Sequence, residues 1–127
     1  MAKMTWRTLT IEADGSVDPM PSKMHGLTGD GICWFVENNA GADVTVKIKD
    51  FKKKSSGAPL NAVDFLVDNC TVTRTATRPG MIVGQIVFRP AGTPGTTVTT
   101  KYTIEVKVSG SPKVDHDPDL DVERPLD

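Results

Sequence analysis

The chain has 127 residues, of which 38% are hydrophobic and 24% are charged, with a formal net charge of −1. This length suffices for one domain with its own core. The balanced charge provides no field that would attract nucleic acid or an anionic membrane surface, and no apolar stretch approaches the roughly 20 residues that cross a bilayer as a helix. The first residues lack the apolar run of a signal peptide. Two locations stay open: the cytoplasm, or export with a leader removed.

Short strands and turns succeed one another in the first half of the chain. Residues 5–13 alternate apolar and polar side chains, which predicts a strand. Residues 17–21 predict an extended edge segment, because their prolines limit pairing. Residues 22–30 are expected to form a loop. The apolar run at residues 32–37 predicts a central strand, and the alternation at residues 43–51 predicts a half-buried one.

One short helix is expected in the second half, at residues 59–68, where Leu60, Val63 and Leu66 have helical spacing after a proline. Three further strands are predicted by alternation, at residues 70–77, 81–88 and 97–108. Residues 114–124 alternate apolar side chains with carboxylates, which predicts a short last strand followed by a mobile tail.

Seven or eight strands with at most one short helix predict an all-β sandwich at residues 1–112, followed by an acidic C-terminal segment at residues 113–127. Trp6 and Phe35 are expected to be buried, and an exposed Trp6 would instead indicate a partner surface. The remaining core is expected to consist of the apolar residues on one face of each strand, which are Leu9, Ile11, Ile32, Trp34, Val36, Val44, Val46, Ile48, Ile86, Tyr102, Ile104 and Val106.

Three pieces of the chain, taken in order, resemble the cupredoxins, the plastocyanin-like copper proteins. They are the turn and strand at residues 29–34, the strand end and turn at residues 35–41, and the late strand at residues 95–106. The acidic residues 117–123 are also similar to the end of bacterial proteins of this type. The resemblance covers most of residues 29–108 and implies a Greek-key β-sandwich.

The resemblance implies the fold of the cupredoxins but does not imply their copper site. Cupredoxins that bind copper use two His, one Cys and usually a Met, with one His after the early turn and the other three ligands in one late loop. Asp43 stands where that first His would lie, and residues 103–112 contain no Cys, His or Met. The departure predicts a metal-free protein without a cofactor.

The resulting hypothesis is a non-enzymatic, metal-free cupredoxin-like module that binds another protein or builds an assembly with itself. No aromatic residues interleave with the lysine run, so a nucleic-acid platform is not expected there. An enzyme ranks last, because no nucleophile and base stand in a recognisable pattern. The candidate interaction residues are Asp43, Lys52, Lys53 and Lys54.

A divergent copper-binding electron-transfer protein is the alternative hypothesis. Its non-standard ligands would be His25, Cys70 and Met24. Cys33 and Cys70 are interpreted as two reduced thiols, since neither has the spacing of a redox motif or zinc site. A disulfide between them is the alternative and would require an oxidising compartment.

Overall fold

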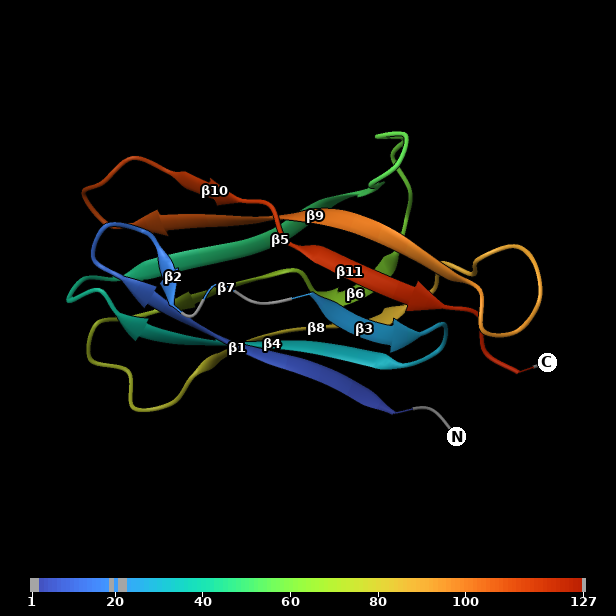
Figure 1. Cartoon of the computed structure of the whole chain (residues 1–127). Helices are drawn as coiled ribbons and strands as arrows, with labels where there is room; N and C mark the ends of the chain where they lie inside the picture. Colours follow the sequence, from blue (N-terminus) through green and yellow to red (C-terminus); the bar gives the residue numbers. More distant parts are fainter. Residues whose placement is uncertain (1–2, 19, 21–22, 127) are drawn as a thin grey trace.

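The computed structural model describes residues 3–18, 20 and 23–126, which form two β-sheets facing each other as the layers of a sandwich (Figure 1). No residue in these ranges is helical. The strands in chain order are β1 (Met4–Glu12), β2 (Val17–Asp18), β3 (Met24–Leu27), β4 (Gly31–Asn39), β5 (Val44–Lys53), β6 (Val63–Val67), β7 (Asn69–Val72), β8 (Gly80–Ile86), β9 (Thr97–Val108), β10 (Val114–His116) and β11 (Asp119–Glu123).

The first sheet has the strand order β2-β1-β4-β8-β6, and the second has the order β3-β11-β9-β5-β7, with β10 paired to β9. Strands β1 and β4 run parallel, as do β3 and β11, and the other pairs are antiparallel. From β2 to β9 every connection crosses from one sheet to the other. Most hydrogen-bonded partners are therefore far apart in the sequence, and their pairing is decided by tertiary packing.

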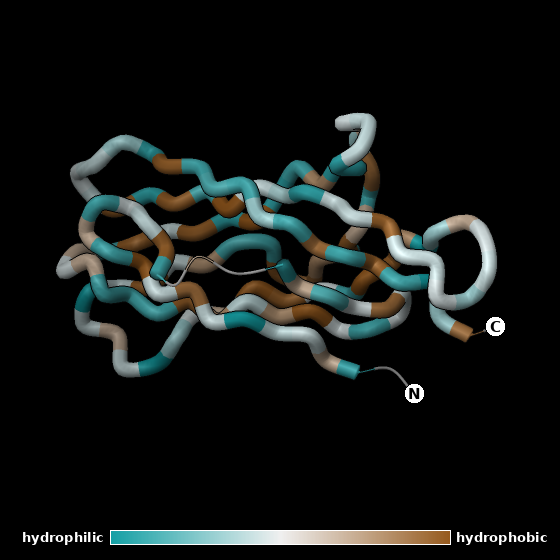
Figure 2. Tube along the Cα trace, in the orientation of Figure 1, coloured by the Kyte–Doolittle hydropathy of each residue, from teal (hydrophilic) through white to brown (hydrophobic). Residues whose placement is uncertain are grey.

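The core lies between the two sheets. All twelve residues predicted for it from alternation are at most 1% exposed, which confirms that prediction. Figure 2 shows apolar and polar residues alternating along several strands. The buried polar atoms of the large aromatic residues find partners: Trp34 Nε1 donates to Tyr102 Oη at 3.2 Å, and that hydroxyl lies 3.5 Å from Met24 Sδ. Burial raises the pKa of Tyr102 to about 12.

The loop predicted at residues 22–30 is wrong in part, because β3 lies within it. Met24 of this strand is fully buried, and β3 pairs in parallel with β11 at the other end of the chain. A run of four residues that includes Gly26 has too little alternation to be recognised as a strand. Its partner strand, distant in sequence, supplies the pairing that holds it.

The helix predicted at residues 59–68 is also wrong, because Val63–Val67 form β6 at the edge of the first sheet. Val63 is buried whereas Leu66 is 83% exposed, so their helical spacing does not mark a shared face. Branched and aromatic side chains favour a strand in this segment. Gly84 on β8 permits the close approach of β6, since a Cβ there would lie 2.6 Å from Val63 Cγ1.

The acidic C-terminal segment contributes β10 and β11 to the second sheet. Leu120 and Val122 alternate with carboxylates as predicted, and both are fully buried. Strand β11 lies between β3 and β9, so this segment covers part of the common core. The described residues form eleven strands rather than seven or eight, because several are only two to five residues long.

Both cysteines are free thiols. Cys33 is 3% exposed on β4, and Cys70 is partly buried on β7. Burial raises the pKa of Cys70 to about 11 and also raises the pKa of Cys33. Both side chains are therefore thiols rather than reactive thiolates near neutral pH.

Candidate functional site

The residues predicted as an interaction surface lie at the two ends of one strand. Asp43 immediately precedes β5, and Lys52 and Lys53 end it. At about 3.3 Å per residue, on the order of 30 Å of chain separates them. Lys54 follows and pairs with Asp119 at 2.8 Å. The four residues therefore do not form one site.

Asp43 has a structural position at the end of the sandwich. Its carboxylate accepts a hydrogen bond from the backbone N–H of Arg74 at 2.9 Å, and its carbonyl accepts one from the N–H of Ser109 at 2.9 Å. A carboxylate at the start of a strand satisfies neighbouring backbone donors in this way. Asp43 thus joins the segments that follow β7 and β9.

The alternative copper ligands are not brought together either. Met24 and His25 are consecutive on β3, so their side chains point to opposite faces of the sheet. Met24 Sδ faces Tyr102 in the core, whereas His25 Nε2 lies 3.0 Å from the Glu123 carboxylate outside. Cys70 lies on β7, at the opposite edge of the same sheet. Within residues 3–18, 20 and 23–126, no three His, Cys, Asp or Glu side chains are grouped to hold a metal ion.

Removing metal is expected to leave stability unchanged, since the described residues offer no clustered ligands whose binding energy would add to folding. The measurement is thermal unfolding before and after dialysis against a strong chelator, with copper or zinc added back as the control. A lower melting temperature that either metal restores would contradict this expectation.

The outer face of the second sheet is charged. Lys49 Nζ lies 2.7 Å from Glu105 Oε1, and Lys113 Nζ lies 3.1 Å from the same oxygen. Hydrogen bonds from these two lysines hold the pKa of Glu105 below its ordinary value. Lys101, on the same strand as Glu105, pairs with Asp119 of β11 at 3.1 Å. These paired charges make the described part of this face polar.

Part of the outer face of the first sheet is apolar. Trp6, predicted to be buried, is 56% exposed, so that prediction is wrong. Because Leu9 and Ile11 fill the core side of β1, Trp6 belongs to the opposite, outward face. Phe35 was also expected in the core, but it is only partly buried and packs edge-on against Trp6, with ring centroids 5.9 Å apart.

These side chains form a continuous surface across four strands. The register places Trp6 opposite Cys33, Cys33 opposite Val83, and Val83 opposite Val67, while Phe35 lies opposite Met81. Met81 is 50% exposed and Val67 is 44% exposed. We call this surface the apolar face, and its members at the surface are Met4, Trp6, Phe35, Leu66, Val67, Met81 and Val83.

The sequence contained a signal for the apolar face. The run at residues 32–37 is apolar on both faces, although the side of a sandwich strand that faces solvent is ordinarily polar. The outward members of this run are Cys33 and Phe35, since Trp34 and Val36 fill the core. The run predicts a central strand, and β4 is the middle strand of its sheet, which confirms the prediction. Its outward apolar side chains also mark the exposed side of this sheet.

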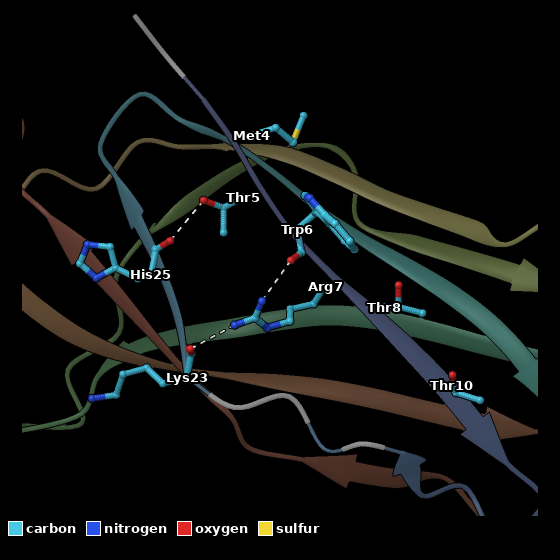
Figure 3. A pocket seen from close by; sticks show the side chains of 8 residues that line it. All are labelled: Met4, Thr5, Trp6, Arg7, Thr8, Thr10, Lys23 and His25. Atoms are coloured by element: carbon cyan, nitrogen blue, oxygen red, sulfur yellow. Dashed lines mark hydrogen bonds between the residues drawn. The ribbon is translucent and has the colours of Figure 1, made fainter.

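An open depression of about 650 Å³ borders the apolar face along the edge of β1. Figure 3 shows the side chains that line it: those of Met4, Thr5, Trp6, Arg7, Thr8 and Thr10 from β1, and of Lys23 and His25 on the facing segment. The Arg7 guanidinium donates to the carbonyl oxygens of Trp6 at 3.4 Å and Lys23 at 3.5 Å, and Thr5 Oγ1 donates to the His25 carbonyl at 3.2 Å. The depression therefore lies between the edges of the two sheets, and the basic side chains of Arg7 and Lys23 line it.

No protein-family model matches the sequence, and no curated protein matches it. Among solved structures, the chain is similar to a chain of the CsuC–CsuE chaperone–tip adhesion subunit pre-assembly complex from the archaic chaperone-usher Csu pili of Acinetobacter baumannii. The TM-score is 0.63 at 12% sequence identity, and the likeness covers 82% of this chain and 49% of that one. This chain thus spans about half the length of its neighbour, and the likeness shows the all-β sandwich alone.

The described residues contain no helix that is long and apolar enough to cross a membrane.

Proposed function

We propose that this chain is a non-enzymatic, cupredoxin-like module that binds another protein within an assembly, and that the apolar face is its binding surface. The observation that carries this proposal is the contrast between the two outer sheet faces. One is a set of paired charges, and the other exposes Trp6, Met81 and Val67 over four adjacent strands. A contiguous apolar patch on a sheet is typical of a protein-binding surface, and tryptophan is enriched among residues that dominate binding energy.

Two observations support the cupredoxin-like part of the proposal. The turn at residues 38–41, one of the pieces that resemble cupredoxins, carries the chain from β4 in one sheet to β5 in the other. Asn38 organises this turn, since its side chain donates to the Ala42 carbonyl at 2.7 Å and accepts from the Ala40 N–H at 2.9 Å. The late strand of the resemblance, β9, runs through the middle of the second sheet.

The structural neighbour supports the protein-binding part. That chain comes from a complex between a chaperone and a tip adhesion subunit, in which proteins of an assembly meet. A sandwich presents rigid sheets to a partner without rearrangement, so the same architecture serves recognition in a metal-free protein.

Placing a photo-crosslinking amino acid at Met81 is expected to yield a discrete crosslinked partner in cells that make the protein, because Met81 is half exposed within the apolar face. The matched control carries the same amino acid at Thr103, on the charged outer face opposite Lys49. A Trp6→Ser change in the Met81 background is expected to remove the crosslinked band while leaving the melting temperature within a few degrees. Equal crosslinking from Met81 and Thr103, or a band indifferent to Trp6→Ser, would contradict the proposal.

A further inference from the structure

We infer that the open edge of β1 accepts an extended peptide segment as an added strand of the first sheet, and that this segment carries a carboxylate for Arg7. The inference rests on the proposed function, since the segment would belong to the protein that covers the apolar face. It goes further by naming the mode of binding and the chemistry of the partner.

On one side of β1, several backbone hydrogen-bonding groups have no partner among the described residues. The N–H of Gly31 donates to the Lys3 carbonyl at 2.8 Å, so in the parallel ladder the odd-numbered residues of β1 bond to β4. The even-numbered residues Met4, Trp6 and Thr8 therefore direct their N–H and C=O groups away from β4. Strand β2 covers this side only at Thr10 and Ile11. Glu12 bonds through its N–H to Ser16 and through its carbonyl to Gly15 in the turn that follows. From Met4 to Thr8, among the described residues, the structure pairs only the Trp6 carbonyl, with the Arg7 side chain.

The open part of β1 has one of the features that normally protect a sheet edge, the charged side chain of Arg7, and lacks the others. Natural edges carry charged side chains, prolines or bulges, or are very short. The other edge of the first sheet, β6, has a register shift between Phe65 and Val67. In contrast, β1 is nine residues long, pairs with β4 without a register shift, and carries Arg7 as its one charged residue between Met4 and Thr8. The depression beside them leaves room for another chain.

The charge of the depression identifies the partner's chemistry. Lys23 and His25 already face carboxylates, at 3.4 Å from Asp121 and 3.0 Å from Glu123. Arg7 reaches only carbonyl oxygens, at the long distances of 3.4 and 3.5 Å, and has no carboxylate partner among the described residues. A guanidinium is best satisfied by two parallel hydrogen bonds to a carboxylate. An incoming segment with an acidic side chain would provide them.

The same charge argues against a second copy of this chain as the occupant. Pairing two β1 edges around a twofold axis would bring two Arg7 side chains toward each other. The open stretch from Met4 to Thr8 contains no acidic residue to compensate them. Like charges opposed in this way are destabilising.

The register of an added strand defines its pattern. Side chains opposite one another in neighbouring strands point to the same side of a sheet. The residue opposite Arg7 would point toward the depression and is the acidic one. Its two neighbours would lie opposite Trp6 and Thr8 on the outer face and extend the apolar face. The pattern sought is an acidic residue between two apolar ones.

The test is selection of a displayed library of random nine-residue peptides against the wild-type chain. The expected result is enrichment of the apolar–acidic–apolar pattern, with at least about tenfold weaker binding when the acid is replaced by its amide. Thr8→Pro removes an edge-directed N–H without touching the bonds to β4, and is expected to abolish binding. Arg7→Gln is expected to retain binding and to lose the preference for the acid over the amide.

Each other outcome overturns the inference. These outcomes are no enrichment, enrichment without the acidic residue, or binding that is indifferent to both variants. A melting curve establishes that Thr8→Pro is folded, and Arg7→Gln gives an independent readout if it is not. Crosslinking from Met81 is measured in parallel on the otherwise wild-type chain. A Met81 crosslink without any enriched peptide would overturn the added strand and leave the proposed function standing, whereas absence of both would remove both.

Discussion

Replacing Ile104 with alanine is expected to lower the free energy of unfolding by about 2–5 kcal/mol. Ile104 is fully buried in the middle of β9, the longest strand, where it lies opposite Ile48 on one side and His116 on the other. Truncation would remove apolar contacts and leave a cavity between the two sheets, and a site bounded by strands on both sides has little freedom to collapse. Equilibrium unfolding in urea measures the change.

The matched control is Thr103→Ala, on the opposite face of the same strand. Its side chain is only partly buried, so the expected change stays within about 0.5 kcal/mol. A loss below about 1 kcal/mol for Ile104→Ala would mean that the facing of β9 is misassigned.

Replacing Leu120 with alanine is expected to cost a similar amount, about 2–5 kcal/mol. Leu120 is fully buried although it belongs to a segment whose other residues are largely acidic. It lies opposite Thr100 of β9 and Met24 of β3, so its strand connects these two strands of the second sheet. Its side chain is part of the core between the sheets. Urea unfolding of the purified variant gives the magnitude.

The chain supplies its own control for this change. Leu126 is the same residue type six positions later, and it is 86% exposed. Leu126→Ala is expected to change stability by less than about 0.5 kcal/mol. Equal small losses for both variants would mean that β11 adds little to the folded sandwich.

The proposed binding surface lies on the side of the sandwich, whereas the copper site of a cupredoxin lies at its end. In a copper-binding cupredoxin the end that follows the early turn holds a ligand. Asp43 stands near that position here and bonds to backbone groups of two other segments. A fold of this kind keeps its core while different surfaces acquire different functions. The apolar face and the adjoining edge of β1 both lie on strands, so a partner would meet a rigid surface.

The sequence by itself determined the class of fold and most of the core. Strand alternation has a period of two residues and is set by local geometry. The sequence alone therefore predicts that Val44, Val46 and Ile104 face the core, whichever strands they pair with. The same rule found the strand containing Leu120 and Val122 in an acidic segment. The missing copper ligands are likewise a property of the sequence alone.

Tertiary structure decided the short strands and the surface. Strand β3 is held by β11, and β6 by β8, and neither pairing has a signal within the segment itself. The outward direction of Trp6 follows from the alternation of β1, but its exposure depends on what covers that side of the sheet. Nothing in the described structure does, because the second sheet packs on the opposite side of β1, where Leu9 and Ile11 are buried. Burial and open edges are properties of the assembled layers, and a local pattern of residues does not contain them.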